Sequence, residues 1–423
     1  MRRLLLPAAL LLALPPAAPA PAVEEGTYDL AVGDPARKGK TAEVVLDGIT
    51  DTRTGQVLTP AELPARVKDV RLLLVGENHT SDEYHRAQLR VVEELRRSGR
   101  EVLLGLEMFP HTDQKVLDDW SAGKLDEAKF LEASRWFKSW GYHWNYYREI
   151  FLFAQRSGIP VVGVNAPREA ITAVRKKGFD KLTPEEKALL PEKVDTSSEE
   201  HRTLFRASFG PDATMHAMMT GEMFEGMFRA QCAWDATMAA NAVKALKARG
   251  GKDAVMVVLV GEGHVAYGLG IERQARAQFD GRIATVVPVP VLDEDARPVK
   301  VRASYADFLW GVMPEEAPLY PLTGLSTRDV PGGETLPVLA VEKDSPAEAA
   351  GFKPGDAIVS IDGVSLKDRE THARQMAGRR WGDAVTYVVK RGEETQTLKV
   401  LLRRTAPKAC PSAPEKKADG PKG

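Results

Sequence analysis

The sequence predicts an α/β fold: a parallel sheet covered by helices on both faces, with a helical insertion, followed by a small β-rich domain. Three observations lead to this prediction. Short apolar runs rich in Val and Leu alternate with stretches of helical periodicity, which is typical of buried parallel strands joined by helices. Two of these runs end in the same pattern, Gly-Glu-x-His. A separate group of short strands follows a segment rich in proline and glycine, residues 317–335.

The composition excludes several classes of protein. The chain has 423 residues, which is enough for two or three domains. Lys and Arg total 58 against 59 Asp and Glu, and this balance gives no electrostatic case for nucleic acid as a partner. The chain has only 2 cysteines, which cannot build a disulfide framework or a four-thiolate zinc site. Any metal ion must therefore be held by His, carboxylate or Tyr.

Residues 1–22 have the composition of a signal peptide. A basic start precedes an apolar stretch from Leu4 to Leu14, and small residues at Ala20 and Ala22 permit cleavage before the mature chain. The short apolar stretch and its prolines argue against a retained membrane helix. We therefore expect an exported protein, periplasmic or secreted, with no membrane span after cleavage.

The elements of the larger domain, residues 23–316, follow in order. Each predicted strand is a short apolar run, and each predicted helix has apolar residues at helical spacing. The helix after the first strand begins at Thr80-Ser81-Asp82-Glu83, whose residue types fit a capping box. Residues 167–253 are longer than a crossover needs, so we expect a helical insertion that caps the strand ends. The predicted strands are 71–76, 101–106, 159–164, 254–261 and 283–289.

Polar residues at the strand ends form the first candidate site. Gly lets the backbone turn sharply there, and open α/β sheets bind ligands at the carboxyl ends of their strands. Two imidazoles with carboxylates and no Cys suit a divalent metal ion or a water held for hydrolysis. The alternative is that these are satisfied polar groups that close the strand ends. The candidate catalytic residues are Glu77, His79, Glu107, Glu262 and His264, and the candidate metal ligands are His79, His264, Glu107 and Glu77.

An aromatic block at residues 136–147 forms the second candidate site. A large flat ligand could stack on it, and a Tyr or His could reach a metal at the centre of that ligand. The alternative is a helix that docks on the sheet through an aromatic face. The candidates for cofactor binding here are Tyr146, Tyr147 and His143, together with His85 on the first helix.

Methionines recur every four residues at 215, 219, 223 and 227. Met is polarisable and adaptable, and it suits a broad apolar ligand or a partner helix. A stripe at helical spacing is, however, more often part of a core. Met219 and Met223 are the candidates for contact with a ligand.

The second domain, residues 317–404, precedes a tail of disordered composition at 405–423. The order SPAEAAGFKPGD followed by IVSIDG resembles a PDZ domain of the bacterial type. The resemblance implies that a peptide C-terminus adds to a sheet edge beside a helix. Leu322-Thr323-Gly324-Leu325 is the candidate for the loop that binds the peptide carboxylate.

The larger domain resembles the ChaN family of haem-binding uptake proteins, within the Tiki superfamily. The resemblance covers residues 45–290 and rests on stretches that include VGENHTSDEYHRAQ, GLEMF, WGYHWNYYREI, VVGVNAPRE, QCAWDATMAANA and VGEGHVAYG. It implies haem binding, often with two haems stacked between the protomers of a homodimer, and a role in iron acquisition at the bacterial envelope. The superfamily also contains metal-dependent proteases and esterase-like enzymes that use paired Gly-x-x-His motifs with glutamates, a pattern that Gly76 to His79 and Gly261 to His264 match.

Three hypotheses follow. The first is an exported haem-binding protein with a PDZ module for a peptide or partner. The second is a metal-dependent hydrolase that uses the strand-end residues, with the PDZ domain presenting peptides. The third is an adaptor in which only the PDZ domain is functional. The intact pair of Gly-Glu-x-His motifs argues against this hypothesis. We expect the first, with haem as the cofactor and a divalent metal ion as the alternative.

Overall fold

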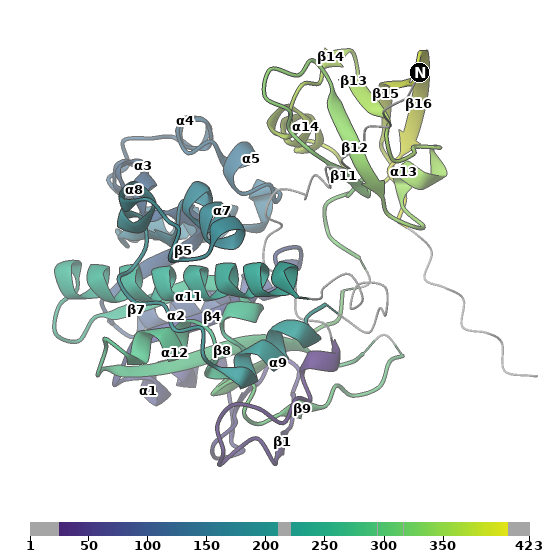
Figure 1. Ribbon diagram of the computed structural model, residues 1–423. Helices are drawn as coiled ribbons and strands as arrows, with labels where there is room; N and C mark the ends of the chain where they lie inside the picture. Colours follow the sequence, from purple (N-terminus) through teal and green to yellow (C-terminus); the bar gives the residue numbers. More distant parts are fainter. Residues whose placement is uncertain (1–24, 210–220, 294, 316, 405–423) are drawn as a thin grey trace, which may run out of the picture. The chain divides into compact units, whose positions relative to one another are not determined.

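The computed structural model describes residues 25–209, 221–293, 295–315 and 317–404. The chain divides into two compact units at the Pro314–Glu315 boundary (Figure 1). The predicted signal peptide, the predicted tail and Met219 lie outside the described residues. Within the described part of the chain, no helix combines the length and the apolar character that crossing a bilayer requires.

The first unit is built on one large sheet, whose described residues form 8 strands in the order β3-β2-β10-β8-β4-β7-β5-β6. The strands from β10 to β6 run parallel, as predicted, whereas β2 and β3 are antiparallel at one edge. A small pair, β1 (Thr41–Ala42) with β9 (Val301–Arg302), lies outside this sheet. The strands are β2 (Ile49–Asp51), β3 (Val57–Leu58), β4 (Val70–Glu77), β5 (Val102–Pro110), β6 (Val161–Asn165), β7 (Val255–Gly261), β8 (Arg282–Pro290) and β10 (Phe308–Val312).

Helices cover both faces of this sheet, which confirms the predicted fold class. Leu72 and Leu74 of β4 pack in one core cluster with Ala239 and Ala242 of helix α11. Side chains alternate between the faces of a strand, and Leu73 points the other way, yet it is also fully buried. Helix α2 contacts β4 and β5. The helices are α1 (Leu63–Arg66), α2 (Asp82–Arg97), α3 (Gln114–Ser121), α4 (Glu127–Ala133), α5 (Trp136–Ser139), α6 (Arg148–Arg156), α7 (Arg168–Lys177), α8 (Pro184–Ala188), α9 (Glu199–Ala207), α11 (Glu222–Arg249) and α12 (Ile271–Arg276).

Helix α11 is the last helix of the crossover between β6 and β7 and lies along the sheet as a long helix (Figure 1). The expectation that the whole of 167–253 is a cap over the strand ends is therefore wrong for this helix. Its close neighbour is α7, because a Cβ on Gly226 would lie 2.6 Å from the carbonyl oxygen of Arg175. The glycine lets the two helices approach, and Met227 packs beside Phe224 and Phe228.

The second unit is an antiparallel β-rich domain, which confirms the predicted small β domain. Its strands run in the order β11-β12-β13-β15-β16, and β14 pairs with β13. Leu336, Ile358 and Tyr387 are among the residues of its own core. The elements are β11 (Leu325–Thr327), β12 (Leu336–Val341), α13 (Pro346–Ala349), β13 (Ala357–Ile361), β14 (Val364–Ser365), α14 (Arg369–Met376), β15 (Ala384–Arg391) and β16 (Glu394–Leu401).

Candidate functional site

Three neighbouring strands at the centre of the sheet, β4, β7 and β5, deliver the candidate site. Glu77 is the last residue of β4 and lies opposite Gly261, the last residue of β7. Glu107 lies in β5, and His264 ends η5 (Glu262–His264), the short 3-10 helix that follows β7. Because parallel strands end on one edge of the sheet, the two Gly-Glu-x-His motifs come together there.

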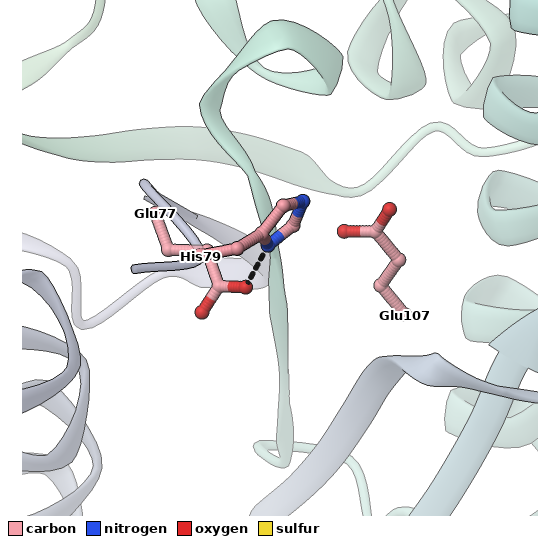
Figure 2. A group of neighbouring side chains, drawn as sticks. All are labelled: Glu77, His79 and Glu107. Carbon is pink, nitrogen blue, oxygen red and sulfur yellow. Dashed lines mark hydrogen bonds and ion pairs between the residues drawn. The ribbon is translucent and has the colours of Figure 1, made fainter. Parts of the chain in front are cut away.

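Glu107 lies between the two histidines. Its Oε2 accepts a hydrogen bond from the Gly261 N–H at 2.7 Å, and its Oε1 lies 3.4 Å from Nε2 of His264. Figure 2 shows the His79 ring with one nitrogen on Glu77 and the other on the side of Glu107. A Cβ on Gly261 would lie 3.2 Å from His79 Nε2 and 3.6 Å from Glu107 Oε2. Glycine at this position therefore leaves room for the imidazole and the carboxylate to face each other.

Glu77 is fully enclosed by other side chains. Its Oε1 lies 2.5 Å from Nδ1 of His79 and accepts a hydrogen bond from the Tyr147 hydroxyl at 3.0 Å. Its Oε2 lies 2.9 Å from Nε2 of His85, at ion-pair distance but without the alignment of a hydrogen bond. Both carboxylate oxygens thus face groups of the protein.

His264 is held from behind by helix α11. Its Nδ1 lies 2.5 Å from Oδ1 of Asp235 and 3.0 Å from the side-chain nitrogen of Gln231. The other oxygen of Asp235 lies 3.6 Å from Nε2 of His201 on α9. Sequence reasoning missed Asp235, Gln231 and His201. The available signal was an acid inside the apolar stretch QCAWDATMAANA, at the spacing of one helical turn from a glutamine.

The remaining predicted site residues are found in different surroundings. Glu262 is buried and accepts a hydrogen bond from the Tyr305 hydroxyl at 3.2 Å. Tyr146 stacks on His85 with ring centroids 5.4 Å apart. His143 accepts the backbone N–H of Asn145 through Nδ1 at 3.2 Å. Met223, with 37 % of its surface exposed, lies on helix α11.

The buried charges shift the pKa values of the site residues. Burial lowers the pKa of His264, but the Asp235 and Glu107 carboxylates outweigh it and raise that pKa to about 10. Burial also lowers the pKa of His79, but the Glu77 carboxylate outweighs the effect of burial and raises that pKa above its usual value. Burial raises the pKa of Glu77, yet the His85 and His79 imidazoles bring it well below its usual range. The site is thus a set of paired opposite charges in the protein interior.

This pairing predicts a maximum of stability near neutral pH. The His264 pKa is raised from 6.5 to about 10 by folding, so its contribution is full below pH 6.5 and is lost as the pH rises to about 10. The Glu77 pKa is lowered from 4.5, so its contribution is lost as the pH falls below that value. Denaturant midpoints measured from pH 4 to 10 should be highest near neutral pH and should decrease toward both the acidic and the alkaline end of this range. A His264→Gln variant should lose part of the alkaline slope, and an unchanged slope would contradict the charge pairing.

A cavity of about 340 Å³ opens beside Glu107. Trp140 and Trp234 contribute aromatic walls, and Met108 and Ile171 add further apolar surface. Trp140 also packs edge-on against His79, with ring centroids 5.0 Å apart. Charged residues of both signs line the cavity: the basic Arg135, Lys138 and Arg168, and the acidic Glu107, Asp113 and Glu169.

The arrangement suits two kinds of chemistry. One ligand atom each from Glu77, His79 and Glu107 lie within 4.8 Å of one another, so these described residues could hold a metal ion. Imidazole and carboxylate donors suit zinc and other divalent transition metals. The cavity, with its aromatic walls, suits a flat ligand.

In the second unit, the predicted loop 322–325 leads into β11, at the edge of the sheet that the described residues form. Gly324 has a φ of +78°, and a Cβ there would lie 2.2 Å from Cβ of Ser345, so only glycine fits. Asp329, just past β11, accepts the backbone N–H of Arg369 at 2.7 Å. This bond ties the start of α14 to the segment after β11.

Comparisons with known proteins agree with both resemblances. Residues 63–274, half of the 423-residue chain, match the family model described as "Haem-binding uptake, Tiki superfamily, ChaN". Residues 321–402 match the model of the PDZ domain. No curated protein matches the chain.

Among solved structures, one similar chain is described as "Cofacial heme binding to ChaN of Campylobacter jejuni". The two are 17% identical, with a TM-score of 0.49, and the match covers 62% of this chain and 95% of that one. The HtrA-type protease AlgW with a decapeptide is 26% identical over 23% of this chain and 33% of that one, with a TM-score of 0.20. The PDZ domain of HtrA3 with a phage-derived ligand is 20% identical over 19% of this chain and 83% of that one, with a TM-score of 0.18. The match to the family model over half of its length shows that the chain belongs to the ChaN family of the Tiki superfamily, with a PDZ domain after the family domain.

Proposed function

We propose that the first unit binds haem in the cavity beside Glu107, and that the protein takes part in haem or iron acquisition or handling. Membership of a haem-binding family supports the choice of ligand. The observation that carries the proposal is the lining of the cavity, which combines the Trp140 and Trp234 side chains with basic residues. Bound haem would supply a redox-active iron, and the task of the protein is to hold and shelter it.

The residues of the cavity fit a haem group in two respects. The macrocycle is flat and apolar, and Trp140, Trp234 and Ile171 offer surface of that kind. The propionates are carboxylates, and Arg or Lys side chains pair with carboxylates through charge-assisted hydrogen bonds. Arg135, Lys138 and Arg168 would hold these groups.

For the iron ligand we propose Tyr142, which the sequence did not single out. Tyr142 is half-buried, and its ring centroid lies 4.7 Å from that of His79 and 5.3 Å from that of Trp140, a wall of the cavity. Tyr147 is fully buried and its hydroxyl is bonded to Glu77. Neither Tyr142 nor the predicted ligands His85, His143, Tyr146 and Tyr147 are among the residues that line the cavity, and Tyr142 borders it through its contact with Trp140.

Haem titration of the purified protein tests this proposal. We expect a shifted Soret band that saturates, and a Tyr142→Phe variant whose band moves or disappears because the iron loses its phenolate. Tyr147→Phe tests the earlier candidate, and Tyr320→Phe in the second unit is the control. A wild-type protein without a shifted band would remove haem as the ligand. Light scattering before and after haem addition tests the homodimer that the family resemblance implies.

A metal-dependent hydrolase is the second candidate function. The observation that favours it is the closeness of the donor atoms of Glu77, His79 and Glu107, with His264 beside them. A metal ion held there would activate water for attack on an ester or a peptide bond. Elemental analysis, with hydrolysis assayed before and after chelation, tests this candidate. A metal-free protein that stays inert in added zinc, cobalt or manganese would count against it.

We further propose that residues 1–22 direct export and that the PDZ domain binds a peptide C-terminus at the edge of β11. The edge position of β11 and the Gly324 turn before it support the peptide site. Cell fractionation tests the export. Fluorescence polarisation with a library of C-terminal peptides tests the binding, and the amidated peptides serve as controls because they lack the carboxylate.

A further inference from the structure

The open edge of β11 in the second unit is short. β11 spans Leu325–Thr327, and in the sheet that the described residues form it has β12 on one side only. Its pairing with β12 shifts register between Ser326 and Thr327, and an irregularity of this kind bends a strand and interrupts its ladder. With about 3.3 Å per residue, the edge offers roughly 10 Å, which is room for about three residues of an added strand.

Just beyond this edge, Asp329 is bonded to the first residue of helix α14. Its Oδ1 accepts the backbone N–H of Arg369 at 2.7 Å, and its Oδ2 accepts the Nε–H of the same residue at 3.3 Å. The N–H groups of the first helical turn have no acceptor inside their own helix, and a negative charge is favoured beside them. We call this pair of bonds the clasp. It joins the segment after β11 to the start of α14.

The clasp lies on the path of a peptide that is held by its C-terminus. Leu325 at the start of β11 and Met376 at the end of α14 both pack, partly buried, against the core of the second unit. The proposed carboxylate loop, residues 322–325, leads into β11, so an extended peptide bound there runs along β11 towards Thr327. Roughly the fourth residue of the peptide, counted back from its C-terminus, then reaches the clasp.

We propose that the clasp limits the sequence that the PDZ domain reads to about three C-terminal residues of its partner. The partner is then a protein or peptide with a free, extended C-terminus, and the residues upstream of those three leave the edge of β11 for solvent. This limit rests on the peptide site proposed above. Asp329 is the residue that sets it.

Opening the clasp brings a peptide no net gain. An upstream residue that entered would displace a charge-assisted hydrogen bond, in which the Asp329 carboxylate holds the Arg369 N–H. In return it would gain neutral backbone bonds, and a charge-assisted bond is roughly twice as strong as a neutral one. The N–H of Arg328 offers such a residue nothing, because it already donates to the carbonyl of Pro337 at 3.2 Å.

The experiment uses the full-length chain and fluorescein-labelled octapeptides with a free carboxylate, whose last residue is Val, Leu, Ile or Phe. The octapeptide that binds most tightly is shortened from its amino end, and fluorescence polarisation gives the affinity at each length. The wild-type affinity should change by less than about twofold between eight residues and four. It should fall by about fivefold or more from three residues to two, because that step removes a strand hydrogen bond.

Three variants show whether Asp329 sets the limit. Asp329→Ala opens the clasp and lets upstream residues pair with the segment after β11, so shortening from eight residues to four should now cost about fivefold or more. Asp329→Asn keeps an acceptor for the Arg369 N–H and should show the wild-type dependence on length. Glu393→Ala removes another exposed acid, in the turn between β15 and β16, and should also behave like wild type.

The outcomes separate the clasp from the peptide site on which it rests. A wild-type chain that binds none of the octapeptides overturns both. A wild-type affinity that falls by more than about twofold from eight residues to four overturns the clasp alone, and so does an Asp329→Ala variant with the wild-type dependence on length. If Asp329→Ala does not fold, hydrogen exchange of the Arg369 amide in the wild type, followed by NMR, decides. Protection retained in the peptide complex supports the clasp, and protection lost on binding overturns it.

Discussion

Replacing Glu107 by alanine is expected to lower the free energy of unfolding of the first unit by about 3–5 kcal/mol. The carboxylate is 5 % exposed and lies between the His264 and His79 rings, whose pKa values are both raised. Without it, the two buried rings lose a neighbouring carboxylate, and the Gly261 N–H loses its acceptor. Urea denaturation followed by Trp fluorescence measures this loss.

Fluorescence suits the measurement because the chain has 7 Trp, of which only Trp381 belongs to the second unit. Glu107→Gln, which keeps an acceptor for Gly261 but no charge, should lose less stability than alanine. Glu132→Ala on the surface of α4 is the control and should change stability by no more than about 0.5 kcal/mol. In a double-mutant cycle, His264→Ala should cost less once Glu107 is absent. A loss below about 1 kcal/mol for Glu107→Ala would contradict a favourable interaction between this carboxylate and the two rings.

Replacing Trp136 by alanine should also cost about 3–5 kcal/mol, because it removes a large side chain from a packed core. Trp136 is 1 % exposed, and its ring contacts Trp144 and Tyr147 with centroids 4.9 and 5.4 Å apart. Its indole N–H donates to the carbonyl of Tyr142 at 2.9 Å, so the loss also frees the segment that carries the proposed iron ligand. The free energy of unfolding and the haem affinity of this variant should therefore both differ from those of the wild type.

A Trp140→Ala variant separates the effect on stability from the effect on haem binding. Trp140 is half-buried and lines the cavity, so this variant should keep most of the stability and lose ligand affinity. Trp136→Phe retains an aromatic ring and should lose less stability than alanine does. If Trp136→Ala and Trp140→Ala cost the same stability, the distinction between a core residue and a cavity residue would be wrong.

The centre of the fold could be predicted from the sequence because buried parallel strands are continuous apolar runs. β4 and β7 therefore stood out, each closing on its Gly-Glu-x-His motif. The short antiparallel strands β2 and β3 have 3 and 2 residues, too few for any periodic pattern. β5 runs on to Pro110, beyond the predicted end at 106, because its pairing with β6 shifts register between Leu106 and Pro110.

The site could be predicted only in part, for a different reason. Glu77 and His79 lie within one motif, so their contact is local, and the shared strand-end edge brings His264 near. Asp235 lies 29 positions before His264 on a helix, and no periodicity links them. The aromatic block was equally ambiguous, since Trp136 packs in the core while Trp140 lines the cavity. The spacing of aromatic residues alone does not show which of them pack in the core and which line a cavity.

Residues of β5 and β6, such as Glu107 and Asn165, make the inner wall of the cavity part of the sheet itself. The pairing of β4 with β7 in the same sheet sets Glu77 opposite Gly261. A slip of either strand by one residue would turn every side chain on it to the other face, so the two imidazoles keep their separation for as long as the sheet is assembled. The outer wall is different, because Arg135, Lys138 and Trp140 come from short helices and connecting loops. An engineer could therefore change the choice of ligand through Arg135, Lys138 and Trp140, and leave the reactive groups where the sheet holds them.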